Sequence, residues 1–172
     1  MSEPAGAPPR VRPTYVLDER ELLDGWLEFH RATLLVKCEG LDDTQRRARP
    51  IPTSDLSLHG LVRHMAETER NWFGRILLRD QAIPPIWNDP AVKDGPLLAI
   101  GSASWAADLA VWQSECRASS DAASRYDLDY TGDWREKQVS LKSIYLHMIQ
   151  EYARHNGHAD LIRELLDGSV GL

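Results

Sequence analysis

The chain has 172 residues, of which 42% are hydrophobic and 27% charged, and its formal net charge is −6. This length is enough for one domain with a full core, and the composition is typical of soluble globular proteins. The 26 acidic residues outnumber the 20 basic ones, which argues against a nucleic acid partner because phosphate binding depends on clustered Lys and Arg. No apolar run approaches the roughly 20 residues of a membrane span, and no signal peptide is recognisable, so we expect a cytoplasmic protein without a membrane partner.

The first residues differ in composition from the rest of the chain. Residues 1–15 contain four prolines and no hydrophobic period, which predicts a flexible arm ahead of a single domain over residues 16–172. Beyond the arm, apolar residues recur at helical spacing in four long segments, and several of these segments begin with a residue suited to capping a helix. The expected helices cover residues 18–40, 57–79, 102 or 104 to 122, and 140–167.

The segments between these helices are long. Residues 80–101 hold several prolines and glycines with Trp87 in their middle, and a loop of this length in a compact domain is usually functional or disordered. Residues 124–139 have no helical period, and we expect a loop with at most a short extended piece. The pattern predicts an all-α fold, an up-and-down four-helix bundle with long inter-helix loops, in which sites form from side chains that project inward from facing helices.

The last expected helix carries an unusual group of polar residues. His147, Glu151, His155 and His158 fall within an arc of about 80° on one helix face. Imidazole and carboxylate groups on a shared inward face lose solvation free energy unless each finds a partner. A metal ion satisfies several of them together, so this face predicts a metal site.

A metal site of this kind needs about three protein ligands, so one ligand must come from another helix. On the last helix, geometry permits three pairs: His147 with Glu151, Glu151 with His155, and His155 with His158. His64 is the natural third ligand because it lies beside the apolar face of the second helix. The other candidates are His30 on the first helix and, less favourably oriented, His59. Each of these single histidines is also compatible with an ordinary hydrogen-bonded place in the core.

Two segments resemble a known family. The run Leu-Val-Arg-His-Met-Ala-Glu-Thr-Glu-Arg-Asn-Trp-Phe around His64, and Glu-Tyr-Ala-Arg-His-Asn-Gly-His-Ala-Asp-Leu from Glu151 onward, resemble motifs of the DinB superfamily, in particular its mini-circle protein branch. The resemblance implies a four-helix bundle with a divalent-metal site made by His64, Glu151 and His155. The Glu151 position is a departure, since the commoner version of the motif has His there. A His-Glu-His set is similar to that of mycothiol-dependent maleylpyruvate isomerases, which hold zinc.

The resemblance implies an enzyme of the superfamily that transfers or isomerises through a metal-activated low-molecular-weight thiol such as mycothiol. Zinc is the expected cation, with nickel, manganese and iron as alternatives, and the resemblance also implies a homodimer. A metal-dependent hydrolase and a non-catalytic bundle that binds a small molecule or partner remain open as other functions. Fold resemblance alone does not decide between them.

Three further residues are predicted to serve this site. His158 and Asp160 are expected to orient the ligands or transfer protons, because a ligating imidazole usually donates its other N–H to an acceptor. Trp87 is expected to anchor the loop over residues 80–101 above the open coordination position, where it would contact the substrate.

Overall fold

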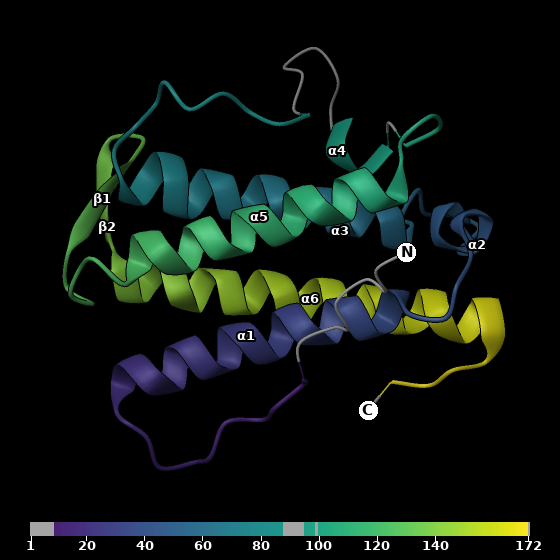
Figure 1. Cartoon of the computed structure of the whole chain (residues 1–172), viewed down its shortest axis with the longest axis horizontal. Helices are drawn as coiled ribbons and strands as arrows, with labels where there is room; N and C mark the ends of the chain where they lie inside the picture. Colours follow the sequence, from purple (N-terminus) through teal and green to yellow (C-terminus); the bar gives the residue numbers. More distant parts are fainter. Residues whose placement is uncertain (1–8, 88–94, 99, 172) are drawn as a thin grey trace, which may run out of the picture.

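The computed structural model describes residues 9–87, 95–98 and 100–171, and the fold there is mostly helical. Four long helical segments lie side by side, with shorter elements at their ends (Figure 1). None of the described helices is long and apolar enough to cross a membrane. The long segments are α1 (Glu19–Cys38), α3 (Leu58–Glu69) continued by the π-helix η1 (Arg70–Leu77), α5 (Trp105–Ala123) and α6 (Leu141–Asp167); the short ones are α2 (Asp43–Arg47), α4 (Gly95–Leu98), β1 (Thr131–Trp134) and β2 (Lys137–Ser140).

The long helices begin and end at the residues that their local chemistry favours. The side chains of Asp18, Ser57 and Ser140 each accept a hydrogen bond from a backbone N–H in the first turn of the helix that follows. Gly168 ends α6 in the left-handed conformation, with φ of 76°, which glycine adopts without a steric penalty. The predicted boundaries of these helices are therefore confirmed to within a few residues.

The long helices do not alternate in direction along the chain. Both α3 and α5 run the same way, because His59 pairs with Asp108 near their starts and Arg70 pairs with Glu115 further along. The expected up-and-down order is thus wrong for this pair of consecutive helices. The reason is that the chain is back at the start of α3 before α5 begins, since the backbone oxygen of Leu97 in α4 lies against Gly60 (Figure 1).

The sequence predicted neither the short helices α2 and α4 nor the pairing of β1 with β2. Residues 41–56 contain the five-residue helix α2, which Asp42 caps together with the side chain of Gln45. The stretch predicted to be a loop with a short extended piece contains the antiparallel hairpin of β1 and β2, in which Thr131 pairs with Ser140 and Trp134 with Lys137. This hairpin packs on the end of η1.

The described part of the N-terminal segment lies along α1. The Arg10 guanidinium donates to Thr33 Oγ1 at 2.9 Å and lies 4.7 Å from the centre of the Phe29 ring. Residues 1–8 of the expected arm lie outside the described residues.

A buried polar network joins the long helices inside the core. Glu69 is fully buried and accepts two hydrogen bonds from the Arg31 guanidinium, at 2.7 and 2.6 Å. The Tyr152 hydroxyl donates to Glu69 Oε1 at 2.8 Å and accepts from Trp112 Nε1 at 3.0 Å. Because Arg31 is on α1, Glu69 on α3, Trp112 on α5 and Tyr152 on α6, this network links the four helices through one carboxylate.

Candidate metal centre

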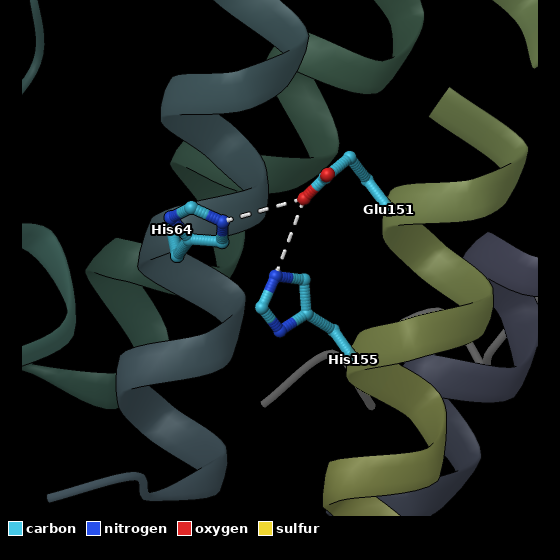
Figure 2. A group of neighbouring side chains, drawn as sticks. All are labelled: His64, Glu151 and His155. Carbon is cyan, nitrogen blue, oxygen red and sulfur yellow. Dashed lines mark ion pairs between the residues drawn. The ribbon is translucent and has the colours of Figure 1, made fainter. Parts of the chain in front are cut away.

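Three side chains converge between the facing helices α3 and α6. Glu151 Oε2 lies 3.4 Å from His155 Nε2 and 4.0 Å from His64 Nε2 (Figure 2). One ligand-type atom from each residue lies within 4.8 Å of the other two. The structure therefore brings together the three residues that were predicted as metal ligands, which we call the triad.

The antiparallel packing of α3 and α6 creates this convergence. Glu151 and His155 are four residues apart on α6 and so lie one above the other on the same face. The His64 ring meets the His155 ring edge to face, with centroids 4.6 Å apart. The side chains of His64, Glu151 and His155 are 29%, 17% and 11% exposed, so the triad is reachable from solvent without being fully wet.

The electrostatics of the triad keep an imidazole neutral. Burial, followed by the neighbouring His64, lowers the pKa of His155 to about 4, although the Glu151 carboxylate acts in the opposite direction. A neutral imidazole offers a lone pair to a cation, as a metal ligand must. At neutral pH the triad thus combines this neutral ring with a carboxylate.

His158 lies where a group that orients a ligand should lie. Its Nδ1 is 3.4 Å from His155 Nδ1, while His155 Nε2 faces Glu151. One of the two Nδ1 atoms must carry the shared proton, so His158 influences which tautomer His155 adopts.

Asp160 does not join this group. Its Oδ1 lies 2.7 Å from Lys37 Nζ on α1. Asp160 follows Glu151 by nine residues, which places it about 180° away around α6. The predicted role of Asp160 beside the ligands is therefore wrong, since the residue faces a different helix.

The remaining histidines lie outside the triad. His147, one turn before Glu151, packs against Trp72 of η1 with ring centroids 4.1 Å apart, and burial lowers its pKa. His59 is fully buried and hydrogen-bonded through Nε2 to Asp108 at 2.8 Å. These two side chains have ordinary packing or hydrogen-bonding roles.

His30 was the other candidate for the third ligand. Asn156 Nδ2 lies 3.4 Å from its Nδ1 and donates to its backbone carbonyl at 3.0 Å. The ring also packs at an angle against Trp26, with centroids 6.1 Å apart. His30 is thus held between α1 and α6 as part of the helix packing, and it is not one of the residues that form the triad.

The segment that crosses from η1 to α5, which we call the crossing segment, is attached to α3 through Ile86 and Trp87. The backbone N–H groups of Ile86 and Trp87 both donate to Glu67 Oε1, and the Arg63 guanidinium lies 4.4 Å from the centre of the Trp87 ring. Arg63 and Glu67 lie one residue before and three residues after His64 on α3. The loop predicted to cover the site continues through residues 88–94 and 99, which lie outside the described residues.

Two aromatic residues near the triad were not predicted to belong to the site. Trp72 was assigned only to an apolar helix face, and Trp134 only to a loop. Gly132 and Trp134 are two residues apart and therefore share a face of β1. The sequence reveals this spacing but does not reveal what the shared face contacts.

The donor set of the triad fits a small divalent cation. Tetrahedral zinc with nitrogen and oxygen ligands at about 2.0–2.2 Å keeps its donor atoms roughly 3.4 Å apart. The Glu151–His155 contact already has this length, and the Glu151–His64 contact needs only a small side-chain adjustment. Two imidazoles and a carboxylate leave a coordination position open, as catalytic zinc sites do.

The family of the chain follows from its sequence over this fold. The family model described as Mycothiol-S-transferase matches residues 22–168. The chain belongs to the mycothiol-S-transferase family. The match covers most of the chain and all three triad residues, and it confirms the expected relation to the DinB superfamily and its mycothiol-dependent members. No curated protein and no solved structure matches the chain.

Proposed function

We propose that the chain is a metal-dependent mycothiol S-transferase in which His64, Glu151 and His155 hold one divalent cation. The observation that carries the proposal is the convergence of two imidazole nitrogens and a carboxylate oxygen from facing helices, within 4.8 Å of one another. Zinc suits this donor set best, while nickel, manganese and iron accept the same atoms. The family supports mycothiol as the thiol substrate. We also infer that the four long helices form the bundle expected of the DinB superfamily.

The reaction forms a bond between the thiol sulfur of mycothiol and an electrophilic carbon of an acceptor. The thiol proton passes to a base, and the acceptor's leaving group departs with its bonding electron pair. A cation bound at the triad supplies the acidity, since a coordinated thiol is deprotonated near neutral pH and then reacts as a nucleophile.

The residues around the triad prepare it for this role. The Glu151 carboxylate contributes a negative charge that partly balances a divalent cation. His158 orients the His155 ring through the contact between their Nδ1 atoms, so that Nε2 points into the triad. The partial exposure of His64 leaves a side from which a thiol can approach.

The same centre with a bound water would act as a hydrolase. We favour thiol transfer because the matching family is named for mycothiol transfer. A bundle that only binds a small molecule would keep the geometry of the triad without turnover.

The test is an assay with mycothiol and monobromobimane, an electrophile whose thiol conjugate is fluorescent. Chelator-treated protein should lose its rate above the uncatalysed background, and added zinc should restore it. His64→Ala should remain inactive with zinc, whereas His30→Gln, a change outside the triad, should keep most of the activity. Full activity of the chelated protein would contradict the metal requirement. Zinc-dependent hydrolysis of an ester in a parallel assay, together with no acceleration of the bimane reaction, would favour the hydrolase.

A further inference from the structure

Three aromatic rings extend from the triad along the α3–α6 side of the molecule. His147 precedes Glu151 by one turn of α6, and its ring centroid lies 4.1 Å from that of Trp72. The Trp72 ring in turn packs against Trp134 of β1, with centroids 5.4 Å apart. Trp134 therefore lies no farther from Glu151 than one helical turn and these two ring spacings together, which is within the reach of one small molecule.

The two indoles differ in exposure. Trp72 is 9% exposed, whereas Trp134 is 38% exposed. The Arg135 guanidinium, on an exposed residue, lies 5.2 Å from the centre of the Trp134 ring. An indole that packs on a second indole and stays partly exposed beside a surface arginine offers a surface on which another flat group can stack.

The backbone of the hairpin places Trp134 in this position. Gly132 lies so close to η1 that a Cβ atom there would be 2.3 Å from the carbonyl oxygen of Ile76. Only glycine permits this approach, and Trp134, two residues later on the same strand, is thereby brought over Trp72. The π-helical winding of η1 also affects where Trp72 points. Each residue of a π-helix advances by a smaller angle than in an α-helix, so the Trp72 side chain leaves the helix in a different direction relative to His64.

The hairpin does not depend on Trp134 to stay attached. Arg79 Nη2 donates to the Thr131 carbonyl at 2.7 Å, Arg79 Nε lies 3.5 Å from Asp133 Oδ2, and Gly132 packs directly on η1. These contacts hold β1 before the tryptophan is considered. Anchoring of the hairpin therefore does not account for the exposed indole of Trp134.

We propose that Trp134, backed by Trp72 and His147, determines acceptor specificity by stacking on a planar conjugated group of the electrophilic substrate. The inference rests on the proposed function, because it places the thiol at the triad and the acceptor's ring on Trp134. The substrate class is an electrophile in which the reacting carbon is attached to an aromatic or conjugated ring. Acceptors with a small aliphatic group gain nothing from this surface.

The test compares the affinities of two product analogues, S-bimane-mycothiol with a flat conjugated ring and S-methyl-mycothiol without one, by calorimetry on the zinc-loaded protein. The wild type should bind the bimane conjugate about tenfold more tightly, an effect of the size expected for one aromatic stacking contact. Trp134→Ala should abolish this preference and leave the affinity for S-methyl-mycothiol unchanged. Trp134→Phe should restore part of the preference.

Tyr15→Ala is the matched control. Tyr15 is also an exposed aromatic residue with an arginine guanidinium over its ring, but it belongs to the N-terminal segment. This variant should keep the full preference. The loss of the preference in Tyr15→Ala as well, or its retention in Trp134→Ala, would overturn the inference.

The remaining outcomes separate the inference from the proposed function. Equal binding of both analogues by the wild type would overturn the stacking role while leaving thiol transfer intact. Binding of neither analogue by the zinc-loaded wild type would overturn the proposed function and the inference with it.

Discussion

Two carboxylates on the facing helices α3 and α6 have opposite surroundings. Glu69 is fully buried and receives three hydrogen bonds at 2.6 to 2.8 Å, from the guanidinium of Arg31 and the hydroxyl of Tyr152. Glu151 is 17% exposed, and the shortest of its ion-pair contacts, to His155, is 3.4 Å. Glu69 is thus satisfied by short hydrogen bonds from buried donors, while Glu151 faces nitrogens of His155, Arg154 and His64 at 3.4 to 4.0 Å, longer than a normal hydrogen bond.

The difference separates a structural polar cluster from a candidate binding centre. Around Glu69 the partners are donors, and they neutralise the carboxylate inside the core. Around Glu151 the one permanent donor that pairs with it among the described residues is the largely exposed Arg154 guanidinium, 3.5 Å from Oε1. On its other side Oε2 faces the neutral His155 ring, whose lone pair competes for the same kind of partner as the carboxylate. Groups that all offer lone pairs to one point are stabilised by a cation.

The largest expected effect is on stability at the satisfied carboxylate. Glu69→Ala removes the buried carboxylate that pairs with Arg31 and leaves that guanidinium the more exposed Glu28, which should lower the free energy of unfolding by about 3–5 kcal/mol. Urea unfolding followed by circular dichroism measures this change. The exposed pair of Lys142 and Asp129 is the control, and Asp129→Ala should have a far smaller effect because solvent screens this pair. A comparably small effect of Glu69→Ala would contradict the claim that the hydrogen bonds of Glu69 stabilise the fold.

The next effect is on metal content and leaves the fold intact. His64→Ala and His155→Ala should each lose most of the bound zinc, because each removes one of only three protein ligands. The helical circular dichroism signal of the metal-free protein should stay at the wild-type level, since the apolar faces of the helices carry the packing. Elemental analysis of the purified variants decides the matter, and stoichiometric zinc in either variant would refute the assignment of that residue.

A smaller loss is expected for Glu151→Gln. The amide keeps nearly the same shape but removes the negative charge, so zinc should still bind, more weakly than to the wild type and more strongly than to His64→Ala. Competition with a fluorescent zinc chelator gives the three affinities. If Glu151→Gln bound zinc as tightly as the wild type, the carboxylate would not be a ligand.

The smallest expected effect on metal binding is that of His147→Ala. The ring of His147 packs on Trp72, and His147 precedes Glu151 by a full helical turn. The zinc affinity of His147→Ala should therefore fall less than that of a variant lacking any triad side chain. The same chelator competition measures it. An affinity as low as that of His155→Ala would show that the centre extends toward η1.

The sequence predicted the helices and the triad for related reasons. Caps such as Asp18 and Ser140 and the 3.6-residue period are local signals, and they set the helix boundaries. The helical spacing left three pairs open on α6, and the resemblance to the family selected Glu151 with His155. The apolar face of the second helix pointed to His64 as the third residue, and the structure places it beside the other two.

The features that the sequence did not reveal depend on contacts between distant segments. The helices α3 and α5 are parallel because the chain returns to the start of α3 before α5 begins. The hydrophobic period within each helix does not predict the path of this connection. The position of Trp134 depends on the fit of Gly132 against the backbone of η1, and an isolated glycine in a strand does not identify its neighbour. Asp160 is a different case, because its nine-residue separation from Glu151 was sufficient to place it on the opposite face of the helix.

The most direct test of the central claim is a crystal structure of the protein grown with zinc, with anomalous diffraction measured on both sides of the zinc absorption edge. We predict one anomalous peak per chain between α3 and α6, within about 2.0–2.2 Å of His64 Nε2, His155 Nε2 and a Glu151 carboxylate oxygen. A peak bound through His158 with Glu151 turned away, or a structure in which zinc soaks leave the triad without a peak, would contradict the account.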